Sequence, residues 1–89
     1  MTFEWDEVKN LRNRRKHGLS FEIAREVFFD PLALFQRDPG SHEEDRWRII
    51  GKVGNTTVAL VVFVVRGSDT EVYRLISASF SAPSAVENS

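Results

Sequence analysis

Arginines on expected strands carry the clearest chemical signal in the sequence. Arg46 and Arg48 alternate with apolar residues, so a strand here places both on one face. Arg66 ends a long apolar run, and Arg74 lies in a further strand-like stretch. Guanidinium groups fixed on a sheet can bind a phosphate bidentately and stabilise charge on a phosphoryl group. The pattern suits RNA cleavage by 2′-hydroxyl attack, whereas the plainer alternative is arginines that keep a sheet soluble and blunt its edges.

That reaction also needs a group that accepts a proton and a group that donates one. His17 ends a predicted helix, where it could act as acid or base or simply cap the negative end of the helix dipole. Glu44 is a candidate general base, although ion pairs with neighbouring strand arginines are its simpler role. Two histidines far apart and no cysteine predict no metal site, and no cofactor-binding motif is present, so no cofactor is expected.

Cationic side chains concentrate in the first 17 residues, where five basic residues face three acidic ones although the net charge of the chain is −1. Such a surface can attract a polyanion. We expect RNA contacts from Arg12, Arg15 and Lys16 on the first helix and from Arg48 on a strand. An ordinary solvated face is the alternative.

The first 31 residues predict a short strand and two helices. Phe3-Glu4-Trp5 alternates like a strand, and Asp6 and Gly18 are good cap residues for a helix between them, with Val8 and Leu11 at helical spacing. Ser20 caps a second helix, which Asp30-Pro31 ends. The second helix carries an apolar stripe of Phe21, Ala24, Val27 and Phe28.

The remainder predicts about four strands, at residues 32–35, 46–53, 56–65 and 72–78. Short turns between them require antiparallel pairing, and the apolar run Val58 to Val65 suits a central strand. We therefore expect an α+β fold, a meander with both helices on one face.

Size and composition predict one soluble domain over residues 1–89, with an irregular tail at 79–89. The 42% hydrophobic content suits a globular protein, and the lack of cysteine fits a reducing cytoplasm. No export signal is apparent, and no apolar run is long enough to span a membrane, so we expect a cytoplasmic protein with no membrane partner.

The order of several short stretches resembles the BrnT toxins, which belong to the wider RelE-like ribonuclease fold of type II toxin–antitoxin systems. The matching stretches are Phe3-Glu4-Trp5-Asp6, Lys16-His17-Gly18, Ser20-Phe21-Glu22, Ala24, Val27-Phe28, Asp30-Pro31, His42 with Glu44 and Arg46, Gly51, and Arg74-Leu75-Ile76-Ser77-Ala78. The resemblance implies an mRNA-cleaving ribonuclease that arrests growth and is neutralised by a BrnA-like ribbon-helix-helix antitoxin. It also implies a heterotetramer containing a toxin homodimer, which touches operon DNA only through the antitoxin.

The chain departs from the family pattern at its end. Ser79 stands where the family has an arginine, Phe80 replaces a cation, and Pro83 falls where a helix should form. We therefore expect a missing or reduced C-terminal helix. The missing guanidinium should weaken cleavage by roughly 10²–10³ in rate unless Arg48 or Arg66 substitutes. An inactive antitoxin-binding, operon-regulating module and a stand-alone nucleic-acid-binding domain remain the alternatives.

Overall fold

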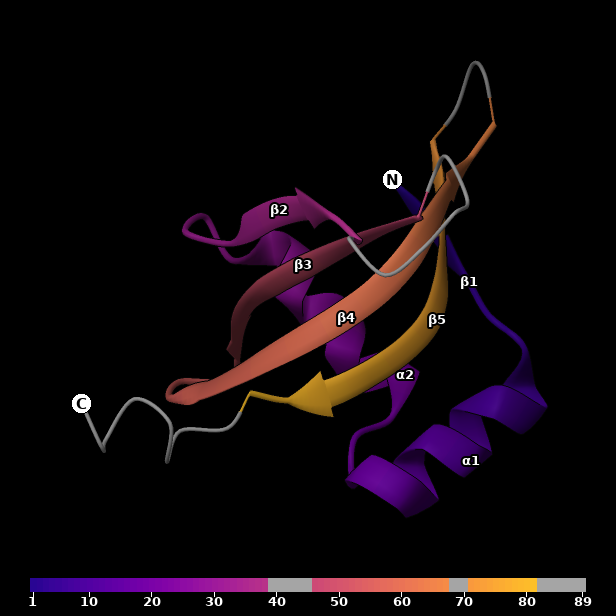
Figure 1. The fold of residues 1–89 in the computed structure, drawn as a ribbon. Coiled ribbons are helices and arrows are strands. Elements are labelled where there is room, and N and C mark those ends of the chain that lie inside the picture. The colour runs from indigo at the N-terminus through magenta and orange to yellow at the C-terminus, as the bar shows by residue number, and fades with distance from the viewer. Residues whose placement is uncertain (39–45, 68–70, 82–89) are drawn as a thin grey trace.

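Two helices and a 3₁₀ turn precede the main part of a five-stranded sheet (Figure 1). The computed structural model describes residues 1–38, 46–67 and 71–81. The elements in chain order are β1 (Thr2–Glu4), α1 (Glu7–His17), α2 (Phe21–Ala24), the 3₁₀ helix η1 (Arg25–Phe29), β2 (Leu34–Arg37), β3 (Arg46–Val53), β4 (Thr57–Arg66) and β5 (Val72–Phe80).

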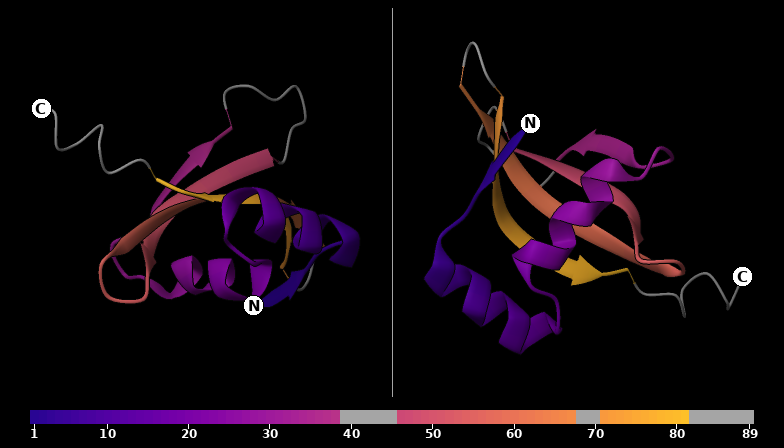
Figure 2. Two further views of the ribbon diagram at one scale, coloured as in Figure 1. Left: turned by 90° about the horizontal axis from the view of Figure 1, so that it is seen from below. Right: turned by 180° about the vertical axis from the view of Figure 1, so that it is seen from behind.

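The sheet has the strand order β1-β5-β4-β3-β2. Strands β2 to β5 form the expected antiparallel meander, and both helices lie on one face of it (Figure 2). The α+β prediction is therefore confirmed. A fifth strand adds to the meander, because β1 pairs in parallel with β5 and makes the sheet mixed. The long excursion through α1, α2 and three strands separates β1 from its partner, so local patterns gave no sign of this pairing.

Helix α1 begins and ends at the predicted caps. The Asp6 side chain accepts a hydrogen bond from the Val8 amide at 2.9 Å. Gly18 adopts a left-handed φ of 74°, and its amide donates to the Arg14 carbonyl at 2.8 Å. These contacts satisfy backbone groups that a helix end otherwise leaves unpaired.

The buried face of α1 is polar. Val8 and Leu11 are 63% and 57% exposed, whereas Asn10 and Asn13 are buried. Asn13 donates to the carbonyls of Leu19 and Ala78 at 2.8 and 2.7 Å, and its Oδ1 accepts from the Ala78 amide at 3.1 Å. The helix therefore docks by hydrogen-bonding backbone at the edge of β5, which apolar periodicity does not reveal.

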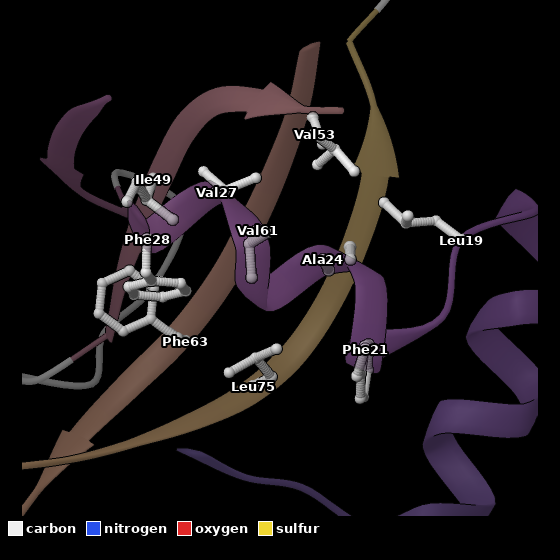
Figure 3. Close-up of a cluster of buried hydrophobic side chains, with 12 residues drawn as sticks. Leu19, Phe21, Ala24, Val27, Phe28, Ile49, Val53, Val61, Phe63 and Leu75 are labelled. Carbon is white, nitrogen blue, oxygen red and sulfur yellow. The ribbon is translucent and has the colours of Figure 1, made fainter. Parts of the chain in front are cut away.

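The core lies between the sheet and the second helical segment (Figure 3). Ser20 caps α2 by accepting from the Ile23 amide at 3.3 Å, and the chain then tightens into η1. The predicted apolar stripe is buried, and it packs against inward-facing residues of the three longest strands. The core residues are Leu19, Phe21, Ala24, Val27, Phe28, Ile49, Val53, Ala59, Val61, Phe63, Leu75 and Ala78.

The end of η1 is joined closely to β3. A Cβ added to Gly51 would lie 3.0 Å from each of Ala33 Cβ, Asp30 Oδ2 and Val27 Cγ1. Asp30 Oδ2 also accepts from the Lys52 amide at 2.7 Å. This corner needs glycine, and it fixes the helical layer relative to β3. No helix in the described ranges is long and apolar enough to cross a bilayer.

Candidate nucleic-acid-binding site

One row of side chains crosses four strands on the sheet face opposite the helices. The pairing register places Arg46 opposite Val64, Val64 opposite Arg74, and Arg74 beside Glu4. Because Phe63 and Leu75 point into the core, their neighbours Val64 and Arg74 point to the opposite face. We call this surface the open face.

Two of the predicted catalytic arginines converge on a single carboxylate oxygen. Arg66 Nη1 and Arg74 Nη1 each lie 2.9 Å from Glu4 Oε2. Their side chains are 59% and 36% exposed, and that of Glu4 is 37% exposed. The hydrogen bond from Arg74, aided by the charge of Arg66, holds the pKa of Glu4 below its usual value. We call the pair Arg66 and Arg74 the arginine cradle.

A second row lies beside the first on the open face. Arg48 is opposite Val62, and Val62 is opposite Ser77. Arg48 Nε donates to Gln36 Oε1 on β2 at 2.9 Å, which holds its guanidinium toward the edge strand. Arg46 and Arg48 thus share the open face, as their spacing predicted, and neighbouring rows are about 6.6 Å apart along a strand.

A basic groove runs between α1 and β5. It encloses about 230 Å³ and is lined by Lys9, Arg12, Asn13, Lys16, His17, Ile76 and Ser77. Three of the predicted site residues, Arg12, Lys16 and His17, therefore meet in one place, with cations on one wall and the β5 backbone on the other. Arg15 is exposed on α1 but does not line this groove.

An irregularity in β5 shapes this groove. Val62 pairs with Ser77 but Phe63 pairs with Leu75, which leaves Ile76 outside the regular ladder. The strict alternation that would align Ile76 with Val72 and Arg74 is therefore interrupted. After the irregularity, Ser77 and Ser79 occupy the positions opposite Val62 and Leu60.

Ser79 lies two rows away from Arg74. Its partner Leu60 is four residues along β4 from Val64, the partner of Arg74, a separation of about 13 Å. Arg48 belongs to the row between them. A side chain at position 79 would therefore contact a different part of a bound polyanion than Arg66 and Arg74 would.

One further functional candidate escaped the sequence reasoning, and one predicted residue cannot be placed. No local pattern marked Glu4 as functional, because its link to Arg74 depends on the parallel pairing of β1. Glu44 and His42 lie outside the described residues. Within the ranges that are described, no three His, Asp or Glu side chains gather as metal ligands would.

The fold has a counterpart among solved toxin structures. The chain is similar to the crystal structure of the Brucella abortus ribonuclease toxin BrnT, with a TM-score of 0.73 and 30% sequence identity over 92% of this chain and 97% of that one. No curated protein sequence matches it.

The sequence itself places the chain within that class. The family model described as the ribonuclease toxin BrnT of type II toxin–antitoxin systems matches residues 5–81. The chain belongs to this BrnT toxin family. Membership in a toxin–antitoxin family implies an antitoxin partner.

Proposed function

We propose that this protein is an endoribonuclease that cleaves mRNA without a metal ion and so arrests growth. The observation that carries the proposal is that Arg66 and Arg74 both donate to one oxygen, Glu4 Oε2. Arg46 lies in the same row of the sheet as Arg74. Converging guanidinium groups suit an oxyanion of a phosphodiester, which is the group an RNA-cleaving enzyme must hold.

The arginines stabilise the negative charge that develops on the phosphoryl oxygens. The 2′-hydroxyl gives up its proton and attacks the adjacent phosphorus, and the bond to the 5′-oxygen breaks as that oxygen gains a proton. The products are a 2′,3′-cyclic phosphate and a 5′-hydroxyl. Guanidinium donors fixed on strands need little reorganisation during this step, which is the basis of electrostatic catalysis. His17 and Glu44 are the proposed proton-transfer groups.

The basic groove provides a path for the RNA backbone. Ser77 lines the groove and also occupies the row of Arg48, so the groove adjoins the open face. Arg12 and Lys16 would bind phosphates in the groove, and Arg48 would bind another phosphate at the far end of the row that contains Ser77. Arg15 would add only long-range attraction, because it lies outside the groove.

We further propose that Ser79 weakens catalysis without abolishing it. The arginine that the family carries here would lie two rows from Arg74, so its absence removes an interaction with a neighbouring phosphate. Arg48, one row closer, is placed to supply part of the missing charge. The proposed C-terminal helix reduction concerns residues outside the described ranges.

The proposed partner is a BrnA-like antitoxin with a ribbon-helix-helix DNA-binding region, in a cytoplasmic heterotetramer that contains a toxin homodimer. Operon DNA would then be contacted through the antitoxin. The edge strand β2 supports the need for a partner, because all four of its residues are exposed, including Leu34 and Phe35.

Induced expression in bacteria tests the proposal. Growth and bulk mRNA decay are compared for the unaltered chain, Arg74→Ala and the control Arg25→Ala, which removes an exposed cation on η1. We expect arrest with mRNA loss for the unaltered chain and the control, and relief by Arg74→Ala. No arrest with any of them, together with intact antitoxin binding, would favour an inactive binding module. Salt-sensitive binding of duplex DNA by the toxin alone would favour a stand-alone DNA-binding domain.

A further inference from the structure

The arginine cradle binds a carboxylate from the same chain, that of Glu4. Both guanidinium groups donate to the same oxygen, Glu4 Oε2, at 2.9 Å. A non-bridging phosphate oxygen requires the same arrangement of donors. The carboxylate therefore occupies the point where the cradle would receive a phosphate.

The contact is well defined in geometry but weak in energy. Glu4 is placed by the register, which sets it beside Arg74, and the two ion pairs are partly exposed to water. Exposed ion pairs stabilise a protein little, since solvent screens them. An incoming phosphate, which can accept from several N–H donors at once, can therefore displace the carboxylate.

We infer that Glu4 is an internal competitor for the phosphate site: it fills the arginine cradle in the RNA-free protein and swings aside when a phosphodiester binds. This inference rests on the proposed function, because it takes Arg66 and Arg74 as the phosphate site. Glu4 sets how readily that site accepts RNA. It also keeps the two like-charged guanidinium groups together while the site is empty.

Binding of an RNA that cannot react tests the inference separately from catalysis. The probe is a short 2′-O-methyl RNA, whose blocked hydroxyl prevents cleavage, and its affinity is measured by fluorescence anisotropy at low salt. The variants are Glu4→Gln and the control Glu26→Gln, which removes an exposed charge remote from the cradle on η1, each alone and combined with Arg74→Gln.

We expect Glu4→Gln to bind the probe roughly 3- to 10-fold more tightly than the unaltered chain. Glu26→Gln should change affinity by less than about twofold, because its charge is distant and screened. The increase in affinity from Glu4→Gln should shrink toward that of the control in the Arg74→Gln background. Unchanged or weaker binding by Glu4→Gln, or an equal increase without Arg74, would overturn the inference.

Two further comparisons keep the result interpretable. Thermal melting shows whether each variant is folded. If Glu4→Gln does not fold, Glu4→Asp replaces it, since aspartate keeps the charge but has a shorter side chain. Glu4→Asp should also bind the RNA probe more tightly than the unaltered chain. Equal or weaker binding by Glu4→Asp would then overturn the inference. If Arg74→Gln alone changes neither binding nor cleavage, the proposed phosphate site fails; if it weakens both while Glu4→Gln has no effect, only the role of Glu4 fails.

Discussion

Asn13 shows how one polar residue can replace an apolar helix face. Its side chain pairs with both the amide and the carbonyl of Ala78, beyond the point where β1 stops pairing with β5. It also satisfies the Leu19 carbonyl. A single amide thus covers a stretch of sheet edge and joins α1 to the sheet, because buried backbone groups require partners.

Replacing Asn13 with leucine should destabilise the protein strongly. The substitution leaves buried backbone groups at Ala78 and Leu19 unpaired, which should lower the free energy of unfolding by about 2–4 kcal/mol. Urea denaturation measures the change. Asn55→Leu, at an exposed turn, is the control and should shift it by less than about 0.5 kcal/mol. Equal effects of the two substitutions would contradict the role given to Asn13.

Three carboxylates make the free energy of unfolding depend on pH. Hydrogen bonds from Arg74, from Asn10 and from the Lys52 amide are the main causes that lower the pKa values of Glu4, Glu22 and Asp30, respectively. A lowered folded-state pKa contributes stability above the unfolded value, and that stability disappears as pH falls through the folded value.

Stability should therefore decline as pH falls below the ordinary carboxyl pKa values of 4.5 for glutamate and 3.8 for aspartate. Chemical denaturation between pH 6 and pH 3 checks this, with the decline reduced in Asp30→Asn. A free energy of unfolding that rises toward pH 3 would show that these contacts do not favour the charged forms.

At the level of elements, the caps and the core stripe could be predicted because their signals are local. Asp6, Gly18 and Ser20 act within a few residues of themselves, and the stripe on the second helix follows the helical period. The helical spacing of Val8 and Leu11 does not mark the buried face of α1, since the tertiary contacts of Asn10 and Asn13 decide how the helix packs.

The candidate site could be predicted in part. The shared face of Arg46 and Arg48 followed from strand alternation, whereas the approach of Glu4 to Arg66 and Arg74 depends on pairing across nearly the whole chain. The irregularity at Ile76 also has no local signature, because it arises in the pairing of β5 with β4. The register between strands that are far apart in the chain cannot be predicted from local patterns in a single sequence.

The corner between η1 and β3 should not accept a side chain at Gly51. Three atoms lie 3.0 Å from the position of an added Cβ, so Gly51→Ala should lower the free energy of unfolding by about 1–3 kcal/mol through overpacking. Thermal or urea denaturation measures this. Lys52→Ala, which keeps the amide bonded to Asp30, is the neighbouring control. A Gly51→Ala protein as stable as the control would show that the corner can relax.

At the scale of the whole molecule, charge is arranged on two adjoining surfaces. The basic groove carries cations from α1 and the open face carries cations from β3, β4 and β5, in a protein whose net charge is only −1. Uneven charge of this kind steers a polyanion even when the net charge is slightly negative.

The salt dependence of RNA binding should report that arrangement. Removing one cation that binds a phosphate lowers the slope of log affinity against log salt by about 0.7 for a single strand. Lys16→Gln should therefore reduce the slope by about that amount, whereas Arg15→Gln, outside the groove, should leave it nearly unchanged. Equal slopes for the two variants would mean that the groove does not direct the RNA.

The open-face arginines are proposed to promote RNA cleavage by 2′-hydroxyl attack. The most direct measurement is an end analysis of a single-stranded RNA incubated with the purified chain, with Arg74→Ala and with Ser79→Arg, in the presence of EDTA. We expect 2′,3′-cyclic phosphate ends from the unaltered chain, faster release of these ends from Ser79→Arg, and a decrease of roughly 10²–10³ in rate with Arg74→Ala. Ends of another chemistry, or cleavage that persists unchanged in Arg74→Ala, would contradict the proposal.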